Sequence, residues 1–200
     1  MFSNARPAEI RERILMAAAI EFADRGYAGT SIALIAERAT TGKGQVQYHF
    51  NAKSEMAVAL VRAAFSRAPF ANLLDADSVH GLEAVVASIR SVGGAFRDEV
   101  QVRAAVRLMR EYHLIPANLP TPYVGWIARI GALLREAEAA GEVRQGIDSE
   151  VEAWHLVSYF YGVQEVSNRL AGREDLAERI EEMLVRALAT LGATTPERFL

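Results

Sequence analysis

The chain has 200 residues, of which 51% are hydrophobic and 24% are charged, a composition typical of a globular protein with a sizeable core. It contains no cysteine, which excludes disulfides, thiol catalysis and cysteine-ligated zinc. Residues 1–67 hold nine Arg and Lys against six Asp and Glu, whereas residues 68–200 hold thirteen against nineteen. A modestly basic N-terminal part on an acidic remainder is compatible with a partner that carries phosphates.

Neither a signal peptide nor a membrane-spanning segment is expected. The first thirteen residues become charged at once and lack the apolar core of a signal peptide. The longest uncharged run of the second half, residues 112–128, carries Pro116, Pro120 and Pro122, so it cannot form a membrane-spanning helix. We therefore expect a cytoplasmic protein with no membrane partner.

Helical periodicity dominates the chain and predicts an all-α fold of about nine helices. The first helix is expected over residues 7–25, with an apolar residue every four positions from Ile10 to Phe22 and with Gly26 as its stop. Residues 30–50 then predict a short helix capped by a threonine or serine, a tight turn and a second short helix.

The second of these short helices has two distinct faces. Val46 and Phe50, four positions apart, are expected to face the core. The other face carries polar side chains beside a residue without a side chain. It consists of Lys43, Gly44, Gln45, Gln47, Tyr48 and His49. Glutamine can bond an adenine edge in the major groove, and this arrangement predicts a helix-turn-helix DNA reader, although short helix pairs also occur in all-α proteins without such a function.

Specific contacts can be assigned within this unit. We expect Gln45 and Gln47 to contact base edges and the other side chains to bind phosphates. The two lysines of the chain stand at either end of the second short helix, and a threonine precedes the unit. The predicted phosphate contacts are Thr30, Lys43, Tyr48 and His49, and Lys53 is also expected to contact DNA.

Beyond Pro69 the chain becomes acidic, and longer helices separated by glycine, proline and capping signals are expected. Ser149 begins a capping-box pattern at one of them. The expected ranges are 79–97, 99–114, 122–140, 149–171 and 174–191. We expect a DNA-binding domain over residues 1–53 and a second domain over residues 54–200, which begins with a connecting helix at 54–67.

The last two expected helices carry extensive apolar surface. In residues 151–170 the apolar side chains cover more than one face, and in residues 174–191 they form a single stripe. This pattern fits either intramolecular packing or a two-fold interface in which both helices meet their copies as a four-helix bundle. We expect a homodimer, because helix-turn-helix readers usually span two half-sites. The predicted interface comprises Val157, Val166, Leu176, Ile180, Met183, Leu184 and Leu188.

Residues 7–62 resemble the TetR family of transcriptional regulators. The resemblance is carried by AIEFADRGYAGTSIALIAERA and by KGQVQYHFNAKSEM. It implies an all-α homodimer whose N-terminal head binds double-stranded operator DNA and whose body binds a small effector that releases the DNA. Thr41, Gly42 and Gln47 differ from the residues common at these positions in the family. Because Gln47 replaces a frequent tyrosine, the operator sequence cannot be carried over from relatives.

The second half is similar to the γ-butyrolactone autoregulator receptors of that family, over residues 122–143 and 158–183. The similarity implies that Trp126 lines the effector pocket and that the helix around Gln164 bounds it. Tyr161 stands where a smaller threonine is common, which would narrow the cavity or move a hydrogen bond. From the sequence pattern alone, Trp126 also fits a core position. We expect a small, largely apolar effector, γ-butyrolactone-like, bound by these three residues.

An enzyme is the main competing class. Glu152 and His155 have the Glu-x-x-His spacing of di-iron helical bundles, but no second copy of the motif is present. The sequence has no nucleophile elbow, and Gly42-Lys43-Gly44 is too short for a phosphate-binding loop. We therefore expect no catalysis, no metal and no cofactor. A helical metal- or cofactor-dependent enzyme and a ligand-binding helical protein without DNA function remain the alternatives.

Overall fold

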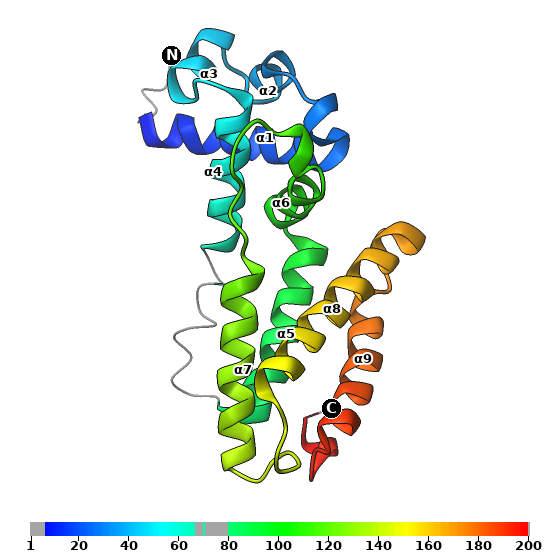
Figure 1. The fold of residues 1–200 in the computed structure, drawn as a ribbon. Helices are drawn as coiled ribbons and strands as arrows, with labels where there is room; N and C mark the ends of the chain where they lie inside the picture. The colour runs from blue at the N-terminus through cyan, green and yellow to red at the C-terminus, as the bar shows by residue number, and fades with distance from the viewer. Residues whose placement is uncertain (1–6, 67–69, 71–79, 200) are drawn as a thin grey trace. The chain divides into compact units, whose positions relative to one another are not determined.

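The computed structural model describes residues 7–66, 70 and 80–199, and within these ranges every regular element is a helix (Figure 1). This confirms the all-α prediction. The chain divides into two compact units, Met1–Ser66 with Glu99–Pro120, and Arg67–Asp98 with Thr121–Leu200. None of the described helices is long and apolar enough to span a membrane.

The first unit is built around α1. Its elements are α1 (Pro7–Gly29), α2 (Ile32–Arg38), α3 (Lys43–His49), α4 (Lys53–Phe65), α6 (Val100–Arg110) and the 3₁₀ turn η1 (Tyr112–Leu114). α1 and α4 both pack against α6, and α1 also packs against α2. These contacts place α4 and α6 in the same compact unit as α2 and α3, whereas the predicted domain limit falls after residue 53. The functional division at that point stays a prediction.

α1 changes direction at Gly26, where the sequence predicted its stop. Gly26 has φ +71° and ψ −178°, a backbone conformation that favours glycine. The Glu111 carboxylate lies where a side chain would be, and it accepts a 2.6 Å hydrogen bond from the amide of Tyr27. Arg107, one turn earlier, donates to the carbonyl oxygen of Ala23 at 2.8 Å and to Glu111 at 3.1 Å. The kink in α1 is therefore held by the end of α6.

The second unit consists of four longer helices and a 3₁₀ turn among the described residues. They are α5 (Gly81–Asp98), α7 (Tyr123–Ala139), α8 (Ser149–Ala171), α9 (Leu176–Leu191) and η2 (Pro196–Arg198). α5 packs against α7 and α9, and α8 packs against the same two helices. Gly93 permits a close approach of α5 to α9, because a Cβ there would overlap Ile180. Arg90 and Glu181 join the same two helices by hydrogen bonds of 2.7 and 2.6 Å.

Most predicted helix limits agree with the structure within a few residues. The predicted ends at residues 67 and 79 lie outside the described residues. One cap is corrected: Asp148, and not Ser149, caps α8, and its Oδ1 accepts hydrogen bonds from the amides of Glu150 at 3.2 Å and Val151 at 3.1 Å. Ser149 is the first residue of the helix, so the carboxylate before it is the group that reaches the free amides.

Candidate DNA-binding unit and effector site

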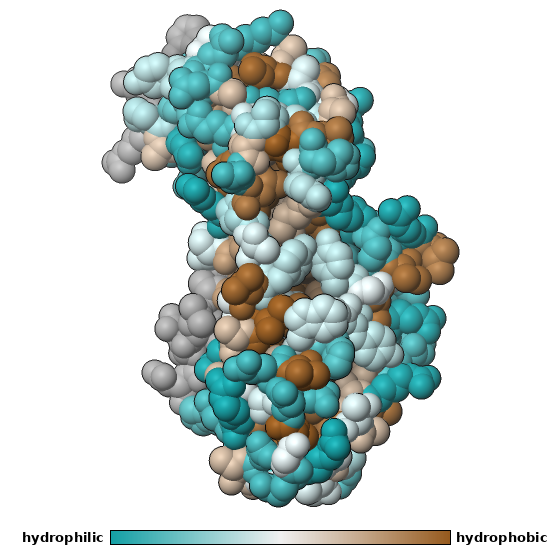
Figure 2. All heavy atoms as spheres, in the orientation of Figure 1, coloured by the Kyte–Doolittle hydropathy of each residue, from teal (hydrophilic) through white to brown (hydrophobic). Residues whose placement is uncertain are grey.

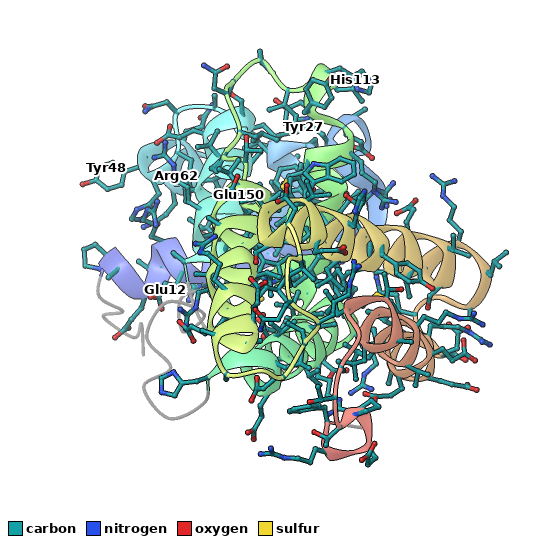
Figure 3. All side chains as sticks on the ribbon, turned by 60° about the horizontal axis from the view of Figure 1, so that its bottom comes forward. Glu12, Tyr27, Tyr48, Arg62, His113 and Glu150 are labelled. Carbon is teal, nitrogen blue, oxygen red and sulfur yellow. The ribbon has the colours of Figure 1, made fainter. Side chains whose placement is uncertain are left out.

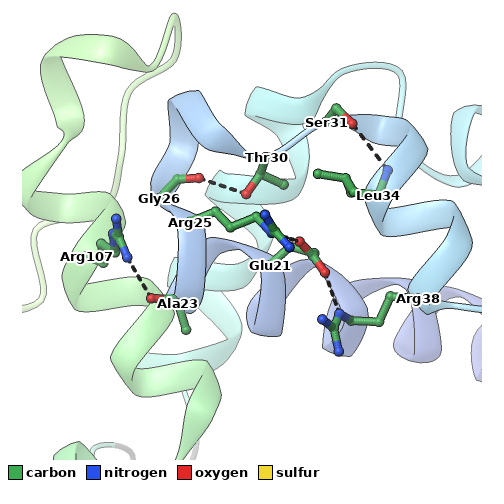
Figure 4. Close-up of polar contacts among 9 residues, drawn as sticks. All are labelled: Glu21, Ala23, Arg25, Gly26, Thr30, Ser31, Leu34, Arg38 and Arg107. Atoms are coloured by element: carbon green, nitrogen blue, oxygen red, sulfur yellow. Dashed lines mark hydrogen bonds and ion pairs between the residues drawn. The ribbon is translucent and has the colours of Figure 1, made fainter. Parts of the chain in front are cut away.

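α2 and α3 are joined by a tight turn. The Ser31 hydroxyl caps α2 by accepting a hydrogen bond from the amide of Leu34 at 3.2 Å (Figure 4). Thr40 has φ +51°, and the amide of Thr41 returns to the carbonyl oxygen of Ala36 at 3.0 Å, which ends α2. Gly42 follows as the N-cap of α3 without a side-chain bond. Residues 31–50 therefore form a helix-turn-helix unit.

α3 divides into a buried and an exposed face, as predicted. Val46 and the following Phe50 are fully buried. The polar residues from Lys43 to Gln47 are exposed, and the Tyr48 side chain is 81% exposed and points away from the rest of the unit (Figure 3). The His49 ring lies edge-on to the Tyr48 ring, with 5.2 Å between centroids. The burial pattern is confirmed, and contact with bases and phosphates stays a prediction.

The ammonium group of Lys53 makes hydrogen bonds within the first compact unit. Its Nζ donates to the carbonyl oxygens of Tyr27 at 2.6 Å and Thr30 at 2.7 Å, and it lies 4.1 Å from the centroid of the Tyr27 ring. Burial lowers the pKa of this ammonium group. The structure thus gives the first residue of α4 a structural role, in which it holds the connection between α1 and α2, and its contact with DNA stays a prediction.

Thr30 is also engaged within the unit. Its side chain is buried, and its hydroxyl donates to the carbonyl oxygen of Gly26 at 2.7 Å (Figure 4). The hydroxyl therefore satisfies the backbone at the α1 kink, and the phosphate contact expected of this residue stays a prediction. The exposed neighbour Ser31 uses its own hydroxyl to cap α2.

Arg11 is a cation near α3 that the sequence pattern did not single out. Its guanidinium carbon lies 4.7 Å from the centroid of the Phe50 ring, which directly follows α3. The side chain is exposed, so the stacking brings a positive charge to the C-terminal end of α3. No local spacing relates residues 11 and 50, and only the packing of α1 beside α3 reveals the pair.

Trp126 lies in an aromatic cluster of the second unit. It is buried, and its indole Nε1 donates to the hydroxyl of Ser88 on α5 at 3.0 Å. Its ring lies edge-on to Phe160 of α8 at 5.1 Å between centroids, and Phe160 meets Phe96 of α5 at 5.2 Å. The indole thereby joins three helices. Its role as part of an effector pocket stays a prediction.

The other two predicted effector residues differ in accessibility. Gln164 is fully buried; its amide donates to the carbonyl oxygen of Tyr161 at 3.2 Å, and its side-chain oxygen accepts from Arg173 at 3.3 Å. Tyr161 is half-buried, and its ring lies edge-on to Tyr123 at 5.4 Å between centroids. The Gln164 amide thus has partners within the protein, and effector contact by either residue stays a prediction.

The predicted dimer interface needs a correction. Six of its seven members are buried in the core of the protomer, because the apolar stripe of α9 packs against α5 and α8. They are Val157, Leu176, Ile180, Met183, Leu184 and Leu188. The seventh, Val166, is exposed together with other apolar side chains of α8 and α9. Tyr159, Val166 and Leu170 lie along one side of α8, at intervals of seven and four residues, and we call these three exposed side chains the outer apolar face.

A groove of about 670 Å³ runs between α8 and α9 beside the outer apolar face. Apolar side chains line it chiefly from α8, including Val163, Val166 and Leu170, whereas charged side chains line it chiefly from α9 and the residue before it. Asp175 accepts a hydrogen bond from Ser167 at 2.5 Å and pairs with Arg179 at 3.0 Å, and these contacts lower the pKa of its carboxyl group. Figure 2 shows hydrophobic surface at the C-terminal end of α8.

Glu152 and His155, whose spacing resembles that of di-iron helical bundles, have different neighbours in the structure. Glu152 lies 3.5 Å from Arg144, and His155 is exposed beside the ring of Trp154. No group of three His, Asp or Glu side chains among the described residues is placed to hold a metal ion.

Comparison with known proteins agrees with this architecture. The family model described as bacterial regulatory proteins, tetR family, matches residues 14–60. The A-factor receptor protein of Streptomyces griseus is 31% identical over 183 residues, which cover 92% of this chain and 64% of that protein. This chain thus spans less than two thirds of that relative.

Several solved structures match almost the whole chain, and two of them bear on its class. One, from work on the control of antibiotic production by a bacterial hormone, is 38% identical with a TM-score of 0.83, and the match covers 92% of this chain and 97% of that one. A γ-butyrolactone receptor described as ArpA-like is 27% identical with a TM-score of 0.81, and the match covers 98% and 94%.

The fold and the helix-turn-helix unit define a DNA-binding transcriptional regulator. The chain belongs to the TetR family of bacterial regulatory proteins. The family resemblance in the sequence, including the similarity of the second half to γ-butyrolactone receptors, is confirmed.

Proposed function

We propose that this protein is a homodimeric repressor that reads a palindromic operator with α3 and releases it on binding a small, largely apolar effector of the γ-butyrolactone class. The observation that carries the proposal is the burial pattern of α3, in which Val46 and the adjacent Phe50 are fully buried. The polar side chains Lys43, Gln45, Gln47 and Tyr48 are exposed. The similarity to an A-factor receptor and to a γ-butyrolactone receptor supports the effector class. The effector would shift DNA affinity by its difference in affinity for the two states.

In this proposal the polar side chains of α3 contact different parts of the DNA. Gln45 and Gln47 contact base edges, while Lys43, Tyr48 and His49 bind phosphates. Gly44 lies in open space, where an added Cβ would meet no atom within 4 Å, so the backbone can approach DNA closely. Thr30 and Lys53 would act indirectly, by holding the unit together.

The DNA-binding proposal is tested by selecting an operator from random double-stranded DNA and measuring its dissociation constant against salt. Lys43→Ala is expected to reduce the slope of log K against log salt by about one, because one phosphate contact is lost. Arg135→Ala, which removes an exposed charge from α7, is the matched control and should leave the slope unchanged. An unchanged slope in Lys43→Ala would remove Lys43 from the contacts.

The effector proposal is tested with a Trp154→Phe variant, which leaves Trp126 as the sole tryptophan. γ-Butyrolactones with acyl chains of increasing length are expected to change the Trp126 fluorescence and to release the selected operator over the same concentration range. Release without a fluorescence change would place the effector away from Trp126. No release by any member of the series would reject the effector class and leave the DNA-binding proposal intact.

Dimerisation is proposed through the outer apolar face and the groove beside it. Leu170 is 82% exposed, and such a side chain next to an apolar groove favours a protein interface. A second copy related by a two-fold axis would bring α8 and α9 of both protomers together as a four-helix bundle.

A further inference from the structure

Glu21 is a charged residue on the buried side of α1. Its side chain is only 4% exposed, next to the fully buried Phe22. One carboxylate oxygen accepts a 2.9 Å bond from Nε of Arg25 on the same helix. The other accepts a 2.5 Å bond from Nε of Arg38, the last residue of α2 (Figure 4). A single carboxylate therefore bonds within α1 and across to α2.

Stability alone is a weak reason for this arrangement. Moving a carboxylate out of water costs free energy, and replacing buried ion pairs by apolar side chains of similar volume is often neutral or stabilising. The two arginine side chains are 54% and 39% exposed, so Glu21 is the group that loses most of its water. An apolar residue at position 21 would serve the core at least as well.

The Glu21–Arg38 pair adds a directional contact between α1 and α2. A charge-assisted hydrogen bond is short and directional, whereas apolar side chains can slide past one another. α2 has only seven residues, and Arg38 directly precedes the turn that leads into α3. Any rotation of α2 on α1 is therefore passed to the helix that carries the exposed polar face.

We propose that Glu21, through Arg38, is a positioning residue that fixes α2 on α1 and thereby sets the orientation in which α3 meets DNA. This inference rests on the proposed DNA-binding function. Arg25 serves as an internal comparison, because it bonds the same carboxylate but lies on the same helix and links no second element.

The test compares the variants Glu21→Leu, Arg38→Met and Arg25→Met. For each variant the melting temperature is measured first. Affinities for the selected operator and for random duplex DNA are then measured well below that temperature. Glu21→Leu and Arg38→Met are expected to weaken operator binding about tenfold, comparable to losing one base contact, with random-DNA affinity unchanged within about twofold. The melting temperature of Glu21→Leu is expected to match or exceed that of the wild type. Arg25→Met should retain operator preference.

Three results would overturn the positioning role. They are equal effects of Arg25→Met and Arg38→Met, wild-type operator preference in Glu21→Leu, and a parallel loss of both DNA affinities in step with melting temperature. Should Glu21→Leu fail to fold, the two arginine variants still decide the question. A wild-type protein without operator preference would instead reject the proposed function, so the two failures are distinguishable.

Discussion

Lys43 and Lys53 carry the same charge and stand at either side of α3, yet their surroundings differ. Lys43 is exposed at the first position of α3. Lys53 is half-buried against two backbone carbonyl groups and the Tyr27 ring. Of two lysines that flank the same helix, the fold therefore holds one by internal contacts and leaves the other exposed to solvent.

Lys53→Met is expected to lower the free energy of unfolding by about 1–3 kcal/mol, because two charge-assisted hydrogen bonds and a cation–π contact are lost. Its salt slope for operator binding should stay at the wild-type value. Urea denaturation and salt titration measure the two effects. Lys43→Ala is the control, with stability expected within about 0.5 kcal/mol of wild type. A stable Lys53→Met variant with a reduced salt slope would restore the phosphate contact.

The α1 kink depends on a single glycine. Gly26→Ala is expected to destabilise the protein by about 2 kcal/mol or more, because alanine is strained at φ +71° and its Cβ would press on the Glu111 carboxylate. The urea midpoint measures the loss. Gly94→Ala is the matched control: it lies within α5 with open space around it, so a neutral or stabilising effect is expected. Equal effects of both substitutions would exclude kink strain as the cause.

The ion pair between α5 and α9 makes a pH-dependent contribution. The hydrogen bond from Arg90 is the main reason that the pKa of Glu181 lies below its ordinary value. A carboxyl group with a lower pKa in the folded state stabilises the protein above about pH 4.3, and this contribution is lost as pH falls through the folded-state pKa. Both side chains are more than a third exposed, so the pair contributes about 1 kcal/mol or less.

Glu181→Gln should therefore be less stable than wild type at pH 7, and the difference should shrink as pH falls toward about 3. Urea denaturation at several pH values measures it. Glu178→Gln, which alters an exposed carboxylate of the same helix, should show a smaller difference throughout. A difference between Glu181→Gln and wild type that does not depend on pH would show that the pair does not carry the effect.

At the scale of the whole molecule, the proposed dimer interface at the outer apolar face can be tested by substitution. Val166→Glu combined with Leu170→Glu is expected to yield a folded monomer at micromolar concentration, because charges on the outer apolar face oppose its burial. Analytical ultracentrifugation and circular dichroism check assembly and folding. Val124→Glu, at an exposed apolar position of α7, should remain dimeric. A dimeric double variant would place the interface elsewhere, and a monomeric wild type would reject the dimer.

The sequence by itself determined the helices and the two faces of α3, because helical periodicity and capping are local properties. An apolar pair four positions apart was enough to predict that Val46 and Phe50 are buried. The family motif in residues 7–62 then indicated the class of protein, and the family match confirmed it. The extent of the first compact unit could not be predicted from the sequence, because α6 belongs to this unit although it lies far along the chain.

Only the tertiary structure decided which partner each side chain has. Lys53 meets carbonyl groups more than twenty residues away, and Glu21 meets Arg38 seventeen residues away, at distances in sequence that no helical period relates. The apolar stripe of α9 correctly indicated that these side chains are buried. It did not indicate whether they pack in the core of their own protomer or against a second copy. An amphipathic pattern specifies that a face avoids water, and only packing specifies what covers it.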